Sequence, residues 1–159
     1  MVASAEKVLE VSPAEAARVI GNAFPSIRTV KPGADGVVTR ALRVYALGTM
    51  RTSNKAEDLT WSVAMLREID QIRKNDPAVQ ADLGEALSKS ESGKTEAFTI
   101  LSKLADKDLM GSPHAYAALA KLKQEKGDTA GAQAAMTKCK EMSGKTAANV
   151  CKLAVAQKA

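Results

Sequence analysis

Apolar residues recur at a spacing of three or four positions along most of the chain, which is the pattern of amphipathic helices. The longest example places five apolar residues on one helix face over about four turns: Leu59, Val63, Leu66, Ile69 and Ile72. Further helices are expected to begin at Pro13, Pro77 and Pro113, because proline fits the first helical turn, where no backbone N–H is needed. The pattern therefore predicts an all-α fold.

Part of the pattern repeats at intervals of 36 positions. Each unit carries a leucine followed by a small residue inside a helical run: Leu47–Gly48, Leu83–Gly84 and Leu119–Ala120. A glycine inside a helix costs about 1 kcal/mol relative to alanine. We therefore expect the small residue to mark a place where one helix of a hairpin approaches its partner closely.

The repeated unit resembles the tetratricopeptide (TPR) repeat, a helical hairpin that stacks on its neighbours. In the first clear unit the matching residues are Leu83, Gly84, Ala97, Leu101 and Ala105. In the next unit they are Leu119, Ala120, Gly127, Ala132 and Met136. The unit is longer than the family's usual one, and Lys123 replaces an expected apolar residue. The resemblance is clear over residues 77–148 and weak over residues 41–76.

The expected architecture is a single domain, residues 1–159, of stacked antiparallel helical hairpins, a TPR-like α-solenoid. An N-terminal helix and connector (1–36) precede a divergent hairpin (37–76) and two TPR-like repeats (77–112 and 113–148). A capping helix (145–159) completes the stack, because the end of a solenoid needs a polar outer face. We expect the N-terminal helix to pack as a second cap, with a mobile or exchanged arm as the alternative.

The formal net charge of +5 lies entirely in the last third of the chain, which carries eight lysines against three acidic residues after position 112. No arginine follows Arg73, and aromatic residues make up only 3% of the chain. Arginine forks and aromatic platforms are the usual means of binding nucleic acid. Nucleic-acid binding is therefore disfavoured, and a solvated helical face is the simpler interpretation.

No apolar run approaches the ~20 residues of a membrane span.

The chain offers almost no catalytic constellation. It contains one histidine, His114, and no Cys/His cluster with zinc spacing. The segment Gly93-Lys94-Thr95 superficially resembles a phosphate-binding loop, but Ser88 stands where that motif requires glycine. We therefore predict that the protein is not an enzyme, with no catalytic residues, no metal site and no cofactor.

The two cysteines, Cys139 and Cys151, fall on the apolar faces of two expected helices, at similar distances from the turn between them. Antiparallel packing would bring them to the same level. A disulfide is slightly favoured over the alternative of two buried thiols. If the disulfide forms, an oxidising compartment is implied, so that the protein would be periplasmic or secreted. The start of the chain has no apolar core like that of a signal peptide, which fits either a cytoplasmic protein or a mature secreted domain.

The TPR resemblance implies that the first helix of each hairpin lines a concave groove that holds a peptide or a partner helix. The side chains expected along this groove are Tyr45, Thr49, Ala81, Glu85, Ser88, Lys89, His114, Ala117, Lys121, Gln124 and Glu125. Lys89 and Lys121 would receive acidic groups of the partner. TPR domains that clamp a chaperone's terminal carboxylate carry asparagines that this chain lacks, which disfavours that ligand.

The function expected from the sequence is thus that of a non-enzymatic protein–protein interaction scaffold, with cell-envelope assembly as one setting. Two other classes stay open. A structural component would self-associate through the convex face or the N-terminal arm and form a homo-oligomer. A protein that binds nucleic acid or an anionic surface would use the lysine-rich end, and its binding would collapse as salt is added.

Overall fold

The computed structural model describes residues 1–33, 36–144 and 150–153, and no strand occurs in these ranges. The helices that it contains are α1 (Val2–Leu9), α2 (Pro13–Ala23), α3 (Gly36–Thr52), α4 (Ala56–Ile72), α5 (Pro77–Leu87), α6 (Lys94–Asp106), α7 (Pro113–Glu125) and α8 (Thr129–Ser143). Two short 3₁₀ helices, η1 (Ile27–Thr29) and η2 (Glu91–Gly93), lie in connecting segments. The prediction of an all-α fold is confirmed.

The helix starts follow from the local sequence. A proline occupies the first position of α2, α5 and α7, as the sequence predicted. The side chain of Asp76 caps α5 by accepting a hydrogen bond from the Ala78 N–H, and Ser112 caps α7 by accepting one from the Ala115 N–H. These caps satisfy backbone donors that the helix itself leaves without partners.

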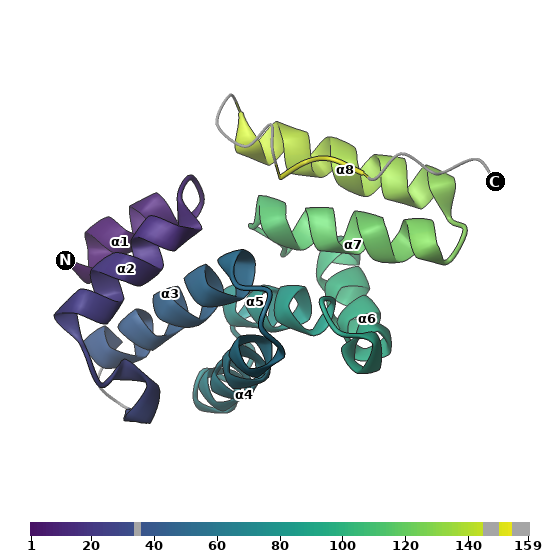
Figure 1. The fold of residues 1–159 in the computed structure, drawn as a ribbon. Coiled ribbons are helices and arrows are strands. Elements are labelled where there is room, and N and C mark those ends of the chain that lie inside the picture. The colour runs from purple at the N-terminus through teal and green to yellow at the C-terminus, as the bar shows by residue number, and fades with distance from the viewer. Residues whose placement is uncertain (34–35, 145–149, 154–159) are drawn as a thin grey trace.

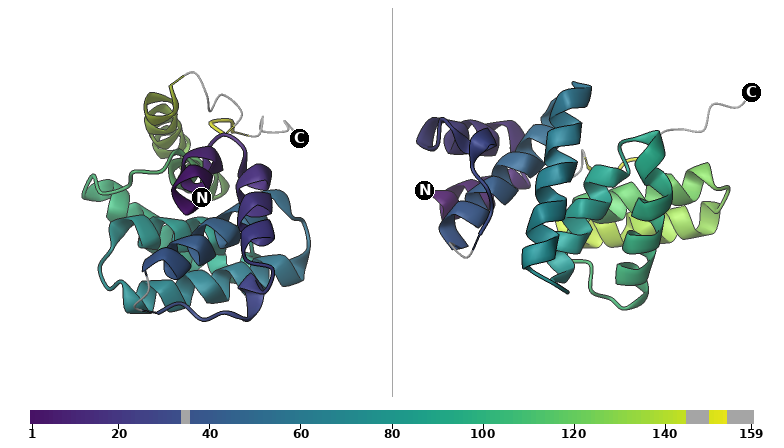
Figure 2. Two further views of the ribbon diagram at one scale, coloured as in Figure 1. Left: turned by 90° about the vertical axis from the view of Figure 1, so that its left-hand side faces the viewer. Right: turned by 90° about the horizontal axis from the view of Figure 1, so that it is seen from below.

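Each helix packs against the next one along the chain, and the odd-numbered helices also contact one another. Contacts join α1 to α3, α3 to α5, and α5 to α7, so these four helices form a continuous layer. The helices α1 and α2 lie at one end of the molecule, and α7 and α8 lie at the other (Figure 1). The view from below shows the same separation of α1 and α2 from α7 and α8 (Figure 2, right).

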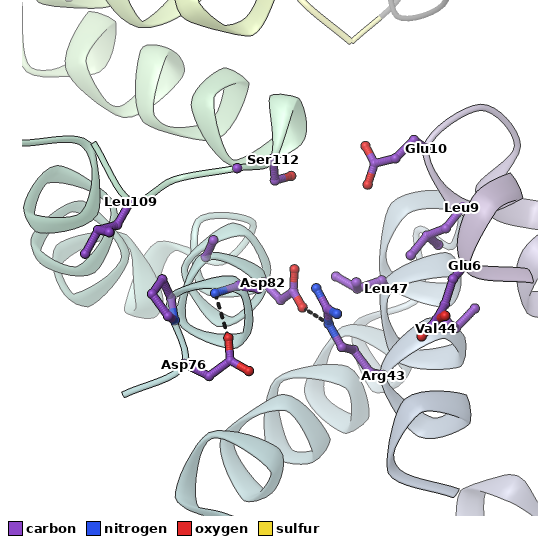
Figure 3. A pocket seen from close by; sticks show the side chains of 14 residues that line it. Glu6, Leu9, Glu10, Arg43, Val44, Leu47, Asp76, Asp82, Leu109 and Ser112 are labelled. Atoms are coloured by element: carbon purple, nitrogen blue, oxygen red, sulfur yellow. Dashed lines mark hydrogen bonds and ion pairs between the residues drawn. The ribbon is translucent and has the colours of Figure 1, made fainter. Parts of the chain in front are cut away.

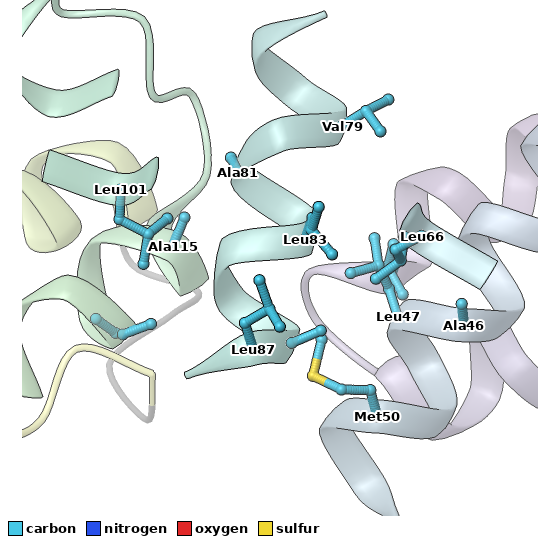
Figure 4. Packing of buried hydrophobic residues seen from close by; sticks show 14 of the residues in the cluster. Ala46, Leu47, Met50, Leu66, Val79, Ala81, Leu83, Leu87, Leu101 and Ala115 are labelled. Atoms are coloured by element: carbon cyan, nitrogen blue, oxygen red, sulfur yellow. The ribbon is translucent and has the colours of Figure 1, made fainter. Parts of the chain in front are cut away.

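The hydrophobic core runs continuously between the helices, as Figure 4 shows for its central part. Leu47 of α3, Leu66 of α4 and Leu83 of α5 are all at most 3% exposed and gather in one cluster. Leu101 of α6 and Ala115 of α7 extend this cluster on the other side of α5. Burial of side chains of this size, at about 1.5–3 kcal/mol each, is the main stabilising contribution to such a fold.

Gly84 lies where α5 and α6 approach each other closely, as expected. A Cβ atom at this position would stand 2.6 Å from Cδ2 and 2.8 Å from Cγ of Leu101, which is too close for an unchanged arrangement. Gly48 differs from this pattern. A Cβ atom there would stand 2.6 Å from the backbone oxygen of Pro13, which belongs to α2 and not to the following helix α4. The two glycines therefore serve different helix pairs, despite their regular spacing in the sequence.

The N-terminal region contains two helices where one was expected. The expected helix is α2, and it packs on α3 as a cap would. The additional helix, α1, buries Val2, Ala5 and Leu9, which share one face at helical spacing. It spans only eight residues, so its apolar pattern covers little more than two turns.

Cys139 and Cys151 lie at disulfide-bonding distance, with 2.10 Å between their sulfur atoms and 5.7 Å between their Cα atoms. The expected capping helix over 145–159 falls largely outside the described residues. The four that are described, 150–153, form a turn and irregular chain.

Among the described residues, no helix is both long and apolar enough to cross a membrane.

Candidate binding surface

A cavity of about 450 Å³ opens between α1, α3, α5 and the segment that precedes α7 (Figure 3). Its apolar wall includes Leu9 of α1, Val44 and Leu47 of α3, and Ala81 of α5. Five charged side chains also line it: Glu6, Glu10, Arg43, Asp76 and Asp82. The cavity thus combines an apolar wall with a small set of charged groups, and three helices far apart in the sequence contribute to it.

Arg43 and Asp82 form an ion pair at this cavity, with the Arg43 Nε–H donating to a carboxylate oxygen of Asp82 (Figure 3). The Asp82 side chain is only 3% exposed, whereas that of Arg43 is 30% exposed. Burial raises the pKa of Asp82 to about 6, although the positive charge of Arg43 opposes this shift. A buried carboxyl of this kind is expensive to ionise, and it depends on its partner.

A second ion pair joins the same two helices. It lies about two turns further along α3 and about one turn further along α5. Arg51 of α3 donates to both carboxylate oxygens of Glu85 at 2.8 and 2.9 Å, and both side chains are almost fully buried. Burial alone would lower the pKa of Arg51, but the charges of Glu85 and Glu10 raise it above its usual value. Arg51 therefore stays charged, and its two-point contact with Glu85 fixes both side chains.

Glu10 connects the N-terminal end of the molecule to the C-terminal end. One of its oxygens lies 3.4 Å from Arg51, and the other lies 2.8 Å from Nδ1 of His114 at the start of α7. Burial alone would raise the pKa of Glu10, but the hydrogen bond with His114 and the charge of Arg51 lower it. Glu10 is therefore held as a carboxylate between the first and the last helical hairpins.

A row of side chains leads along α5 from the cavity to a pair of lysines. Ala78, Ala81 and Asp82 line the cavity, Glu85 lies about one turn further along the same helix, and Lys89 lies just beyond the helix end. The pKa of Lys89 is lowered, first because its ammonium loses hydration and then because Lys121 of α7 repels it. Lys89 and Lys121 are both exposed, and they lie close enough to influence each other electrostatically.

We call the face of α1, α3, α5 and α7 that carries the cavity the central surface. Its principal side chains are Glu10, Arg43, Asp82, Lys89 and Lys121. His114 and Lys121 share one face of α7 at a spacing of seven residues, and His114 contacts the cavity residue Glu10. This places Lys121 on the same side of the molecule as the cavity.

Several of the residues predicted to line a groove do lie on or beside the central surface. Ala81 lines the cavity and His114 contacts the cavity residue Glu10, whereas Glu85, Lys89 and Lys121 lie further along the chain of α5 and α7. The structure assigns others to packing or to hydrogen bonds within a helix. Thr49 and Ala117 are buried, and Gln124 is half-buried. The Ser88 hydroxyl donates to the Glu85 carbonyl.

Two of the predicted groove residues lie elsewhere. Tyr45 packs edge-to-face on Trp61 of α4, with ring centroids 5.6 Å apart, and the Arg28 guanidinium lies over its ring. It therefore sits between α3 and α4 and does not line the cavity. Glu125 pairs with Lys94 at the start of α6, at a distance of 3.0 Å. Both side chains are positioned by partners on neighbouring helices.

The sequence pattern did not reveal the charged residues that organise the central surface. Glu10 directly follows α1, a helix that was not expected, so its position was not considered. Arg43, Arg51 and Asp82 sit among apolar residues of α3 and α5, and Asp82 directly precedes Leu83. A charge inside an otherwise apolar helix face is the signal that could have identified them, because such a group needs a buried partner.

The central surface places charged groups in fixed positions beside an apolar wall, an arrangement that suits the binding of another molecule. Among the described residues, no group of three or more His, Cys, Asp and Glu side chains is placed to hold a metal ion. The charged groups are held in fixed positions by ion pairs and surround an apolar wall. Such an arrangement orients a bound molecule through a few polar contacts, while apolar contacts contribute most of the affinity.

No family model matches the chain, and comparisons with curated proteins and with solved structures gave no match.

Proposed function

We propose that the protein is a non-enzymatic protein–protein interaction scaffold, built as a TPR-like stack of helical hairpins, that binds a peptide or a partner helix on its central surface. The observation that carries this proposal is the cavity of about 450 Å³ between α1, α3 and α5. Binding sites for small molecules and side chains are typically clefts of about 300–1,000 Å³ with mostly apolar walls and a few polar groups.

The ion pairs around the cavity support a binding role. Arg43, Arg51 and Glu10 are each held by partners on other helices, so their positions are set before any ligand arrives. A site whose groups are already ordered loses less conformational entropy when it binds.

The helix contacts support the stacked arrangement. Consecutive helices pack as hairpins, and the odd-numbered helices contact one another in sequence order, as the first helices of stacked hairpins would. The close approach of α5 and α6 at Gly84 is the contact that the repeat pattern predicted within one hairpin. The cysteine pair at bonding distance supports a location in an oxidising compartment such as the periplasm.

The proposal is tested by capturing partners from a native extract with crosslinking, using the wild-type protein and two variants. Ala78→Trp places a large side chain at the cavity, since Ala78 lines it and is exposed at the start of α5. Ala64→Trp makes the same change at an exposed position of α4, outside the cavity, and serves as the matched control.

We expect Ala78→Trp to lose the captured partner and Ala64→Trp to retain it, with both variants folded by circular dichroism. If Ala78→Trp captures the same partner as the wild type, binding on the central surface is wrong. A mass that increases with protein concentration and is unaffected by Ala78→Trp would instead favour the structural alternative, self-association through the outer face or the N-terminal helices.

A further inference from the structure

A second cavity, of about 360 Å³, opens between α4, α5 and α6. On α5 it is lined by Gln80 and Leu83, which lie on the helix face opposite to that of Ala78 and Asp82. The second cavity is therefore on the other side of α5 from the central surface. We call it the outer groove, and its principal side chains are Leu83, Ile100, Lys103, Leu104, Lys107 and Leu109.

The wall of the outer groove contains large apolar side chains. Leu83 and Leu104 are at most 4% exposed, and Ile100 is half-buried beside them. Leu109, which follows α6, is 47% exposed and lines the same groove. Replacing water on such a wall by an apolar group is favourable, in proportion to the apolar area that is covered. The wall therefore favours an occupant with an apolar part.

Two lysines lie beside this wall. Lys103 is in the last turn of α6 and Lys107 lies one turn later, and both are exposed and line the groove. Within the part of the chain that the structure describes, neither ammonium group pairs with a carboxylate. Asp106 and Asp108 are neighbours of Lys107 in the sequence, but neither of them lines the groove. The two positive charges are therefore available to an anionic group.

Asp70 of α4 is the carboxylate among the residues that line the groove, and Arg67 offsets its charge. One carboxylate oxygen of Asp70 is buried. Arg67 lies one turn earlier on α4, and its pKa is raised, first by its hydrogen bonds with Glu96 and also by the charge of Asp70. The two lysines on the α6 side outnumber this carboxylate, so the groove favours an anion.

An ion pair closes one end of the groove. Arg67 of α4 donates to both carboxylate oxygens of Glu96 of α6, at 2.8 and 2.9 Å. Each of the two residues precedes the lining residues of its helix by about one turn, so the pair connects the helices at the end farthest from Lys107. A protein segment running through the groove would have to break this pair, whereas a small molecule entering beside Lys107 would not.

The length of the groove sets the size of the occupant. Ile100 and Lys107 are separated along α6 by about 10 Å, at about 1.5 Å per residue. An extended alkyl chain with C–C bonds of about 1.5 Å covers this distance with about eight carbon atoms. The cavity volume also falls within the range of about 300–1,000 Å³ that is typical of small-molecule sites.

We propose that the outer groove binds a carboxylate with a medium-length alkyl tail, of the kind found in medium-chain fatty acids. The tail lies on Leu83, Ile100 and Leu104, and the carboxylate lies between the ammonium groups of Lys103 and Lys107. The site is on the other side of α5 from the central surface, so this inference goes beyond the proposed function and does not depend on it.

The test measures the binding of three small molecules by isothermal titration calorimetry: octanoate, butanoate and the uncharged octanamide. We expect octanoate to bind at least about tenfold more tightly than butanoate, because each buried CH₂ group increases the affinity about fourfold. Octanamide should bind about threefold more weakly than octanoate, since exposed ion pairs with the two lysines contribute modestly. The difference between octanoate and octanamide should shrink in about 0.5 M salt, which screens the charges.

A pair of tryptophan variants locates the site. Thr99→Trp places a large side chain in the groove, and Thr137→Trp makes the same change at an exposed position of α8. Both threonine hydroxyls donate to the carbonyl four residues earlier in their helix, so the two substitutions remove the same kind of hydrogen bond. We expect Thr99→Trp to lose octanoate binding and Thr137→Trp to retain it, with both variants folded by circular dichroism.

The role of the lysines is tested by combining Lys103→Gln with Lys107→Gln, both at exposed positions. This double variant should bind octanoate no more tightly than it binds octanamide. The control combines Lys7→Gln with Lys140→Gln, at exposed positions of α1 and α8 outside the groove. The control should bind octanoate as the wild type does.

Three outcomes would overturn the inference. If octanoate does not bind at millimolar concentration, or binds no more tightly than octanamide, the groove does not recognise such a carboxylate. Octanoate binding that survives Thr99→Trp would place the ligand elsewhere on the protein. A partner protein that is captured from extract by the wild type and by Ala78→Trp, but not by Thr99→Trp, would show that a protein covers the groove instead.

Discussion

Asp82 is the residue whose burial most strongly affects the energetics of the central surface. Its carboxyl is 3% exposed, and its partner is the more exposed Arg43 on the neighbouring helix. Replacing one member of such a pair usually costs more than the pair contributes, because the other charge stays buried without a partner. The protonation state of Asp82 therefore couples the stability of the protein to pH.

The stability contributed by Asp82 should fall as pH rises. Burial raises its pKa in the folded protein to about 6, above the value of about 3.9 expected for the unfolded chain. The folded state thus binds the extra proton between these values, and it loses the associated stability as pH rises through about 6. In Asp82→Asn this contribution is absent. We expect the free energy of unfolding of Asp82→Asn, measured in urea, to increase relative to that of the wild type between pH 4 and pH 7.

A difference between Asp82→Asn and the wild type that does not change with pH would contradict the raised pKa. A difference that changes in the opposite direction would show that the carboxylate is stabilised in the folded state. The variant Asp106→Asn, at an exposed position near the end of α6, controls for the loss of a carboxylate as such. The free energy of unfolding of Asp106→Asn should change with pH as that of the wild type does.

A second prediction for a single residue concerns Gly84. Alanine there gains helix propensity of about 1 kcal/mol, but its Cβ atom requires Leu101 to move. These effects oppose each other, so we expect Gly84→Ala to change the melting temperature little. Gly84→Leu overfills the contact and should destabilise by about 1–3 kcal/mol or more. Gly21→Ala in α2, where the new Cβ atom meets only Tyr45 at 3.4 Å, is the control and should be neutral or stabilising.

If Gly84→Leu melts at or above the wild-type temperature, the close approach of α5 and α6 is wrong.

At the scale of elements, the sequence predicted the helices from α2 to α8 because their signals are local. Apolar spacing and the prolines at positions 13, 77 and 113 depend only on residues within one or two turns. The contacts between helices could not be predicted in the same way. Gly48, like Gly84, follows a leucine inside a helical run, yet it faces the preceding helix. The cavity was missed for a related reason, since Glu10, Arg43 and Asp82 meet only in three dimensions.

The difference between the two glycines can be measured. A Cβ atom at Gly48 meets the backbone oxygen of Pro13 at 2.6 Å and the Ala17 Cβ at 2.9 Å, and backbone cannot rotate aside as the Leu101 side chain can. We therefore expect Gly48→Ala to destabilise the protein by about 1–3 kcal/mol, as overpacking typically does. Urea unfolding of Gly48→Ala and Gly84→Ala compares them directly. Equal stability of the two variants would contradict the distinct environments.

The cysteine pair should stabilise the C-terminal end. Cys139 is fully buried on α8, and its partner lies 12 positions further along the chain. Closing a loop of this size contributes about 3 kcal/mol when the loop constrains the unfolded state. We expect a thiol reagent to find no free thiols in the native protein and two after reduction, and the melting temperature to fall on reduction. Two thiols titrated in the unreduced protein would show that the bond does not form.

At the scale of the whole molecule, the contact between Glu10 and His114 joins elements that are otherwise at opposite ends. The two residues are separated by 104 positions, and they bridge the end of α1 and the start of α7. Glu10 also contacts Arg51, so the central surface is crossed by a row of charges from α1 through α3 to α5 and α7. The relative positions of the two ends are thereby tied to the geometry of the cavity.

A double-mutant cycle measures the coupling energy between Glu10 and His114. Glu10→Ala, His114→Ala and the double variant should give a coupling energy of about 0.5–1 kcal/mol, since the Glu10 carboxylate is partly exposed to solvent. The coupling should decrease in high salt, because part of it is electrostatic. A cycle between Glu57 and His114 serves as the control, since Glu57 lies on α4 and is exposed. A coupling near zero for Glu10 and His114 would show that the two ends do not depend on each other.

The same contact limits how this chain can change in length. A protein made of repeated helical hairpins lengthens when a hairpin is duplicated, because each unit needs only its immediate neighbours. Here a hairpin inserted between α4 and α5 would move His114 a full unit further from Glu10, and it would also part Arg43 from Asp82. An inserted hairpin would therefore separate these charged partners and remove the cavity that they border.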